Sequence, residues 1–154
     1  MNKTTKIFAI LFLFTLVLLQ CTCSLAAPKA KEENLFVSGR PTIICFGGSY
    51  CPACKLALPA LKAMQKKYNG RATILYLDVE KDRSLARDFP LQVIPTYFFY
   101  DKNGKIYLPS KKVAEKIEFN QRKDWKTGKA EWQLHMGALS EEDLEAILAD
   151  LGVK

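Results

Sequence analysis

The alternation of apolar and polar positions divides this chain into short runs whose periods predict strands and helices. Residues 42–46 and 72–79 are mostly apolar and rich in β-branched side chains, a pattern typical of strands buried on both faces. Between them, apolar residues recur at helical spacing over 51–68 with lysines at intervening positions, which predicts an amphipathic helix. A helix that joins two strands implies a right-handed crossover, so we expect the two strands to pair in parallel.

Shorter elements are predicted after the second strand. Residues 81–89 predict a short helix that Pro90 limits, and residues 97–100 predict a third strand. Asn103-Gly104 is a hairpin signal in which both turn residues tolerate positive φ. We therefore expect the return strand to start at 106–108.

The C-terminal part combines one segment of weak pattern with one clear helix. Residues 109–131 are rich in charge and only weakly periodic, whereas residues 132–136 alternate and could resume the return strand. Ser140, with an acidic residue three positions later, resembles a capping box, and the apolar helix face that follows ends at Gly152. The elements together predict an α/β domain, a mixed central sheet with helices on both faces.

The first 27 residues have the anatomy of a signal peptide. Two lysines precede a run at 7–19 that is apolar except for one threonine, and Ser24-Leu25-Ala26 offers a small-x-small cleavage site. The apolar run is short for a membrane span. Two alternatives stay open, namely an uncleaved N-terminal anchor and lipidation at Cys21.

The rest of the chain divides into a charged linker at 28–34 and a folded domain at 35–154, in which 35–37 could form a short edge strand or one helical turn. Without the leader the net charge falls from +7 to +5, because the leader carries two lysines and no acidic residue. Mild basicity suits many surfaces, including anionic membranes. Aromatic and basic residues are not interleaved, so we expect no nucleic-acid partner. No dimerisation element is evident, so we expect a monomer.

Cys51 and Cys54 form a C-x-x-C pair between the first strand and the helix. We expect Cys51 in the first helical turn, where unpaired N–H groups and the macrodipole favour its thiolate. Cys54 should lie one turn further in, more buried and neutral. Pro52 suits such a first turn, because the N–H that it lacks would be unpaired there. A thiolate beside a second thiol is the machinery of thiol–disulfide exchange, and an oxidising compartment would let the pair rest as a disulfide.

Other interpretations of the same residues stay open. The pair could be a structural disulfide, although so small a loop removes little entropy from the unfolded chain. Cys45 is interpreted as a packed core residue and His135 as an ordinary strand residue. Alternatively, Cys51, Cys54 and His135 could hold copper in a carrier protein, and the same three with Cys45 could form a zinc site.

Taken in this order, the features resemble the thioredoxin superfamily. Besides the C-x-x-C pair, the matching residues are Lys55, Pro59, Ile94-Pro95-Thr96, Lys102-Asn103-Gly104 and the sequence 137–140. The resemblance covers 35–153 and is interrupted by 109–131, which would be an insertion before the last strand of a thioredoxin fold. It implies a protein-disulfide oxidoreductase whose redox group is the Cys51–Cys54 disulfide, with no metal and no other cofactor.

The resemblance also implies a substrate groove beside the cysteines. Pro95 would be cis and lie against the pair, and Ile94 would offer its carbonyl and N–H to an extended substrate segment that adds as a strand. Tyr50, Pro52 and Ala53 would form the rim of this groove.

Five positions depart from the family pattern. Tyr50 replaces a tryptophan, and Pro52-Ala53 replace Gly-Pro. Cys45 stands where the family keeps a buried aspartate, and Ile74 stands where its lysine partner lies. A buried carboxylate would raise the pKa of nearby thiols and relay their protons, so neither the relay nor the redox poise of thioredoxin carries over.

We therefore expect an exported, periplasmic or extracytoplasmic thiol–disulfide oxidoreductase that acts on protein thiols and disulfides. Its expected direction is reductive, with electrons supplied by a thiol–disulfide partner in the membrane. A proline after the first cysteine occurs in both oxidants and reductants of the superfamily, so the motif alone does not set the direction. The alternative is a non-catalytic thioredoxin-fold binding module such as the copper carrier.

Overall fold

The computed structural model describes residues 35–123 and 127–154, which belong to a compact unit spanning Glu32–Lys154. The described residues do not include the predicted signal peptide or the linker. The alternatives of an N-terminal anchor and of lipidation at Cys21 also fall outside them. No helix in the described part of the chain is long and apolar enough to cross a membrane. The elements are, in order, β1 (Thr42–Gly47), α2 (Pro52–Lys67), β2 (Thr73–Asp78), the 3-10 helix η1 (Arg83–Ala86), β3 (Thr96–Tyr100), α3 (Lys111–Ala114), β4 (Asn120–Lys123), β5 (Ala130–Met136) and α4 (Glu141–Asp150).

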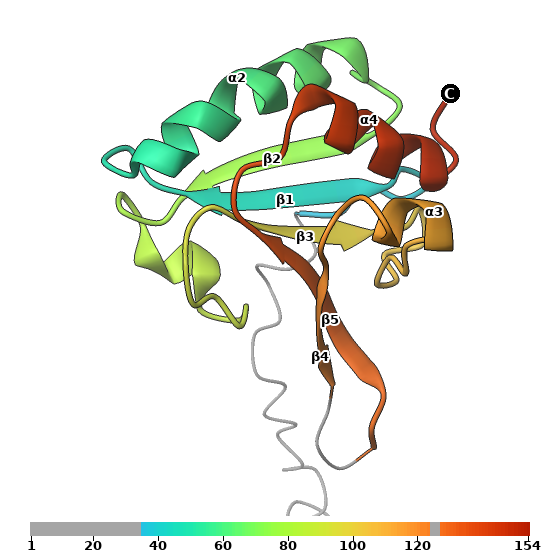
Figure 1. Ribbon diagram of the computed structural model, residues 1–154. Coiled ribbons are helices and arrows are strands. Elements are labelled where there is room, and N and C mark those ends of the chain that lie inside the picture. Colours follow the sequence, from blue (N-terminus) through green and yellow to red (C-terminus); the bar gives the residue numbers. More distant parts are fainter. Residues whose placement is uncertain (1–34, 124–126) are drawn as a thin grey trace, which may run out of the picture. The chain divides into compact units, whose positions relative to one another are not determined.

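The strands form one mixed five-stranded sheet with the order β2-β1-β3-β5-β4 (Figure 1). β1 and β2 are parallel and are joined through α2, as the crossover argument predicts. The β1–β3, β3–β5 and β5–β4 pairs are antiparallel. This arrangement places the β1–α2 loop, the end of β2 and the loop before β3 at the same end of the sheet (Figure 1).

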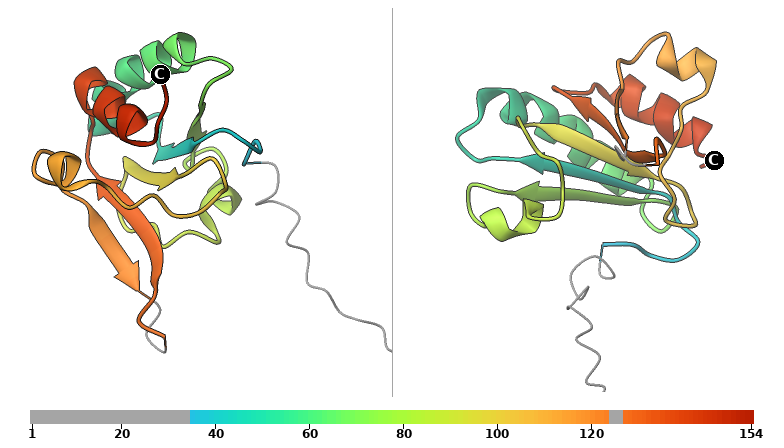
Figure 2. Two further views of the ribbon diagram at one scale, coloured as in Figure 1. Left: turned by 90° about the vertical axis from the view of Figure 1, so that its right-hand side faces the viewer. Right: turned by 90° about the horizontal axis from the view of Figure 1, so that it is seen from below.

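The two faces of the sheet bury separate apolar clusters, because side chains alternate along each strand. Ile43 and Cys45 of β1 face the cluster that α2 and α4 cover, and Figure 2 shows these helices side by side over that face. Ile44 and Phe46 face the other cluster, which η1 and the loops around it cover. Helices thus lie on both faces, but in the described part of the chain one face carries only the 3-10 helix η1.

Two predicted elements differ in the structure. β2 is an edge strand whose side chains pack against both clusters, but only Ile74 is buried and the others stay partly exposed, so the strand is less buried than its apolar sequence predicts. The predicted helix at 81–89 shrinks to η1, which the Asp82 carboxylate caps by accepting from the N–H of Ser84 at 2.9 Å. Residues 35–37 form neither a strand nor a helix.

The turn after β3 is not the predicted two-residue hairpin. Gly104 has φ +72°, but no described residue other than glycine has positive φ, so Asn103 is not left-handed. The Asp101 carboxylate instead accepts from the N–H groups of Asn103 and Lys105, both at 2.8 Å. A three-residue loop with glycine in the left-handed position results.

The insertion at 109–131 contains α3 and β4, and it supplies a strand that the sequence does not reveal. Residues 106–108 contribute only an isolated bridge between Tyr100 and Ile106, and the strand that returns beside β3 is β5. β3 pairs with the C-terminal part of β5, whereas β4 pairs with β5 over most of its length. The far end of the β4–β5 hairpin extends beyond the other strands (Figure 1).

α4 begins and ends as predicted. Ser140 and Asp143 form a complete capping box, with the Ser140 Oγ accepting from the N–H of Asp143 at 3.1 Å. At the other end Gly152 has φ +81°, and Val153 donates its N–H to the carbonyl of Leu148 at 2.9 Å.

Asp150, in the last turn of α4, ties the insertion to the core. Its carboxylate accepts from the hydroxyl of the buried Tyr107 at 2.5 Å and from the N–H of Ser110 at 2.9 Å. Burial alone would raise the pKa of Asp150, but the hydrogen bonds from Ser110 and Tyr107 outweigh it and hold the pKa below its ordinary value. The ionised carboxylate therefore stabilises the folded state.

We expect Asp150→Asn to lower the free energy of unfolding at pH 7 by about 1 kcal/mol, because an amide accepts these bonds more weakly. The folded-state pKa lies below the unfolded one, so this difference is complete above about pH 5 and disappears as the pH falls through the folded pKa. Urea unfolding from pH 7 to pH 2 measures it. The control is Glu118→Gln, at an exposed carboxylate of the same insertion. A pH-independent difference would contradict the assignment.

Candidate active site

Cys51 is the N-cap of α2 rather than a residue of its first turn. Its backbone is extended, with φ −78° and ψ 116°, and Pro52 follows at the first helical position. The Cys51 Sγ atom accepts the N–H of Cys54 at 3.1 Å, in the same way that the side-chain oxygen of a serine or aspartate N-cap accepts such an N–H. The prediction is thus wrong by one residue, but its electrostatic reason is kept, since a helix N-terminus favours negative charge on that sulfur.

Cys51 and Cys54 form a disulfide with a Cα–Cα distance of 5.2 Å. Cys54 is 1% exposed, whereas Cys51 remains partly accessible. The pair therefore has an outer sulfur that a partner can reach and an inner sulfur that a partner cannot, which confirms the predicted asymmetry. This is the geometry for attack at one sulfur and resolution by the other.

The loop before β3 lies directly against the pair. The Ile94–Pro95 peptide bond is cis, Pro95 is buried, and the Sγ atom of Cys51 lies 3.6 Å from the carbonyl oxygen of Ile94. The Thr96 hydroxyl donates to the carbonyl of Val93 at 2.7 Å, which closes the loop on itself. The fold thus brings Cys51 and Ile94 together, as predicted, although they are more than forty residues apart in sequence.

The surface around the pair is apolar and exposed. Tyr50 is 85% exposed, and Pro52 and Ala53 are also exposed, in agreement with positions on a rim. Leu56 and Val93 belong to the same end of the domain and are 77% and 50% exposed, but we did not predict them. The sequence signal that could have identified Leu56 is its position on the polar face of the amphipathic helix, where an apolar side chain is exposed to solvent.

Cys45 is a core residue, as predicted. It is 0% exposed and lies in the cluster that includes Ala57 and Leu61 of α2. Burial raises the pKa of the Cys45 thiol to about 12, and a polar contact with Tyr97 offsets this only in part. Ile74 is also buried, so neither departure from the family pattern supplies a proton acceptor.

The ligands required by the copper and zinc alternatives are not gathered into one site. Among residues 35–123 and 127–154, no three His, Cys, Asp or Glu side chains are placed to hold a metal ion. His135 lies on β5 with its Nδ1 atom 2.7 Å from the carbonyl oxygen of Glu118. His135 is therefore not grouped with Cys51 and Cys54 as a ligand set among the described residues.

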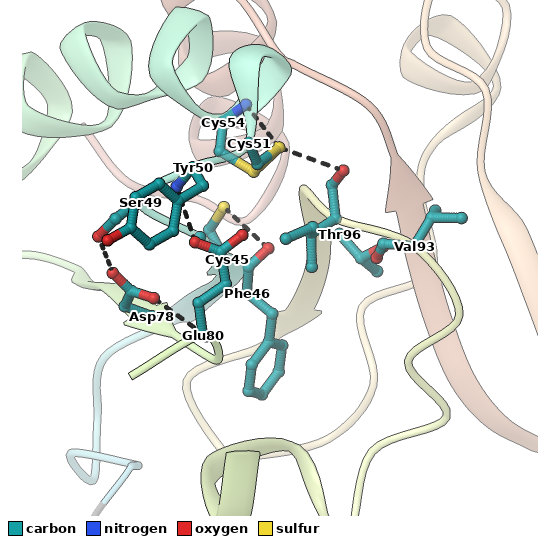
Figure 3. The surroundings of a disulfide bond; sticks show 12 residues. Cys45, Phe46, Ser49, Tyr50, Cys51, Cys54, Asp78, Glu80, Val93 and Thr96 are labelled. Atoms are coloured by element: carbon teal, nitrogen blue, oxygen red, sulfur yellow. Dashed lines mark hydrogen bonds between the residues drawn. A yellow bond between two sulfur atoms is a disulfide. The ribbon is translucent and has the colours of Figure 1, made fainter. Parts of the chain in front are cut away.

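Two carboxylates that we did not predict hold the loop ahead of Cys51. Ser49 donates its hydroxyl to Asp78 Oδ2 at 2.5 Å, and Tyr50 donates its N–H to Glu80 Oε2 at 2.7 Å (Figure 3). Both contacts cross about thirty residues of sequence, so no local pattern reveals them.

The fold and the cysteine pair together define a thioredoxin-like protein. A family model described as Thioredoxin matches residues 25–122, more than half of the chain. The chain belongs to the thioredoxin family.

Individual relatives agree with this assignment. Thioredoxin H4 of Arabidopsis thaliana is 32% identical over 78 residues, which are 51% of this chain and 60% of that protein. The thioredoxin of Staphylococcus saprophyticus is 31% identical over 101 residues, which are 61% of this chain and 97% of that protein. The chain spans only 55% of the chloroplastic thioredoxin Y2 of Arabidopsis thaliana. A crystal structure of chloroplastic thioredoxin z shares the fold, with a TM-score of 0.51, 17% identity and coverage of 74% of this chain and 80% of that one.

Peptide-resolved alkylation checks the different states of the cysteines. We expect iodoacetamide to label Cys51 of the reduced native protein at pH 8 at least about 100-fold faster than Cys45, because the Cys45 thiol is inaccessible and almost entirely protonated. In urea the two residues should react at similar rates. Labelling of native Cys45 within tenfold of the Cys51 rate would show that the sulfur is not buried.

Proposed function

We propose that the chain is an extracytoplasmic thiol–disulfide oxidoreductase that reduces protein disulfides through Cys51 and Cys54. The observation that carries this proposal is the placement of the pair, with Cys51 accessible at the N-cap of α2, Cys54 buried behind it, and the Ile94 carbonyl 3.6 Å from the outer sulfur. A structural disulfide would have no need of an accessible sulfur beside an apolar rim.

The first step is attack by the Cys51 thiolate on one sulfur of a substrate disulfide. A new bond forms between Cys51 and that sulfur, the substrate S–S bond breaks, and the second substrate sulfur leaves as a thiolate that takes up a proton. The N-terminus of α2 stabilises the attacking thiolate, and the N–H of Cys54 points at it from 3.1 Å.

The second step resolves the mixed disulfide. Cys54 loses its proton and attacks the Cys51 sulfur, which restores the Cys51–Cys54 disulfide and releases the remaining substrate thiol. The substrate has then gained two electrons and two protons, and the protein is oxidised by the same amount. Cys45, whose thiol has a pKa of about 12, cannot accept the Cys54 proton at neutral pH, so we assign that proton to water or to the departing substrate thiolate.

The substrate is proposed to bind as an extended segment along Ile94 and Pro95. Pro95 has no N–H, so the backbone there offers the Ile94 carbonyl and N–H to an added strand. Tyr50, Pro52 and Ala53 form the opposite rim. Exposed apolar side chains on this rim would contact the partly unfolded or extended chains that present a disulfide.

The proposed location and partners rest on the sequence of the leader. Export would place the domain where substrates carry disulfides, and a membrane thiol–disulfide donor would return two electrons to the Cys51–Cys54 pair. We propose that the protein works as a monomer and needs no cofactor beyond this pair.

Insulin reduction in the presence of dithiothreitol tests the activity. We expect Cys51→Ser to lower the rate at least about 100-fold, because the attacking sulfur is lost. Cys54→Ser should instead accumulate a mixed disulfide with the substrate that survives non-reducing gel electrophoresis. Cys45→Ala, which removes the third cysteine of the domain, is the matched control and should retain activity. Equal rates for Cys51→Ser and the parent would end the proposal.

Export of the full chain from a bacterial host tests the location. We expect the mass of the recovered protein to correspond to cleavage near residues 26–27, and a Leu13→Arg, Leu16→Arg variant to be blocked because its apolar run is broken. Full-length protein in the membrane would indicate the anchor, and lipid incorporation at Cys21 would indicate the lipoprotein. Unprocessed parent protein confined to the cytoplasm would contradict all three.

A further inference from the structure

The end of β2 carries a turn that is fixed by the Asp78 side chain. Asp78 Oδ1 accepts from the N–H groups of Glu80 and Lys81 at 3.1 and 3.3 Å, and Oδ2 accepts from the Ser49 hydroxyl. The hydrogen bond from Ser49 lowers the pKa of Asp78 below its ordinary value, so this residue stays ionised. One side chain thus holds both the turn after β2 and the loop after β1.

This turn directs Glu80 at the backbone immediately ahead of the nucleophile. Glu80 Oε2 accepts the N–H of Tyr50 at 2.7 Å, and Tyr50 is the residue before the N-cap Cys51. Charge-assisted bonds of this length are among the stronger ones. Glu80 therefore helps to set the path by which the chain enters α2.

Gly48 is an independent indication that the approach of Glu80 is built into the fold. A Cβ atom added to Gly48 would lie 2.3 Å from Glu80 Cδ and 2.5 Å from its Oε1 atom. Gly48 does not have positive φ, so the glycine is not required by backbone conformation. The absence of a side chain there makes room for the carboxylate.

The same carboxylate places negative charge against the backbone N–H of the residue that precedes Cys51. The first turn of α2 contains no acidic residue, so the helix itself favours the Cys51 thiolate. Glu80 opposes this, because a nearby like charge disfavours ionisation. Lys81 does not offset Glu80 directly, since its Nζ atom lies 3.6 Å from Asp78 Oδ2.

Other titratable groups also lie on the elements around this end of the sheet. Cys45 and Tyr97 stay neutral, because burial raises the pKa of both. Burial also raises the pKa of Tyr76 on β2. The remaining groups on the surrounding elements are Lys55 on α2, Asp78 at the end of β2 and His135 on β5.

We propose that Glu80 is a positioning residue for Cys51, which fixes the Tyr50 backbone and makes the Cys51 thiolate less favourable than the helix N-terminus alone would. This inference rests on the proposed function and refines it by assigning a cause to the reductive direction. Oxidation of the pair releases two electrons and two protons. When the Cys51 thiolate is less stabilised, the reduced form of the protein is less stable relative to the disulfide form. The reduced pair then gives electrons to substrates more readily.

The test compares Glu80→Gln with Glu131→Gln in the full chain. Glutamine keeps an oxygen that can accept the Tyr50 N–H but removes the charge, and Glu131 is an exposed residue of β5 that undergoes the same charge change. A Cys21→Ser, Cys23→Ser background leaves Cys45, Cys51 and Cys54 as the only thiols. Absorbance at 240 nm during a pH titration of the reduced protein measures the Cys51 thiolate, and equilibration with glutathione measures the redox constant.

We expect Glu80→Gln to increase the thiolate-to-thiol ratio of Cys51 at least about twofold at any pH near its midpoint, and to shift the glutathione equilibrium toward the reduced protein. Gly48→Ala, which keeps the charge but displaces the carboxylate, should shift both quantities in the same direction and lower Tm. Glu131→Gln should leave both unchanged.

A thiolate titration of Glu80→Gln that matches Glu131→Gln would overturn the inference, whatever happens to stability, because a purely structural role changes Tm without changing the thiolate ratio. Failure of the proposed function has a different signature. A parent protein that does not reduce insulin, but whose thiolate titration still responds to Glu80→Gln, would refute the activity and leave the role of Glu80 intact.

Discussion

The site of this domain is built on one capping interaction, the N–H of Cys54 donated to the Cys51 sulfur at the start of α2. A cysteine in the N-cap position is held where the helix N–H groups converge, so its sulfur is both positioned and electrostatically favoured as an anion. The parallel β1–α2–β2 crossover puts that position at the end of the sheet. The loop before β3 ends there too, which brings the Ile94 carbonyl to 3.6 Å from the same sulfur.

Two opposing influences meet at Cys51. The helix terminus favours the thiolate, whereas Glu80, which accepts the N–H of Tyr50, is proposed to make it less favourable. Beneath them, the core offers a neutral thiol at Cys45 in place of an ionisable carboxylate. The ionisation of Cys51 therefore depends mainly on groups at the surface of the domain. The reduction potential of the pair has to be derived from this chain and cannot be transferred from its relatives.

Sequence patterns predict the parts of this structure that burial or local chemistry dictates. The run at 42–46 is apolar throughout because β1 is covered on both faces, and the capping box at Ser140 needs only residues three apart. Sequence patterns fail where a residue's hydrogen-bond partner is distant in sequence, or where a strand buries little apolar surface. β4 consists of Asn-Gln-Arg-Lys at an edge, so no apolar alternation marks it, and Glu80 gains its role from Tyr50 thirty residues earlier. Asn103 keeps an ordinary φ because the Asp101 carboxylate organises the turn instead.

The standard reduction potential of the Cys51–Cys54 couple tests the central claim most directly. Reduced and oxidised protein would be equilibrated with defined thiol–disulfide buffers at pH 7, with the Cys51-Cys54 disulfide quantified by mass after alkylation. A reductant governed by the balance described above should have a potential below roughly −230 mV, on the thioredoxin side of the glutaredoxins. A value near −120 mV, typical of a strong oxidant, would contradict the account, as would a pair that does not exchange at all.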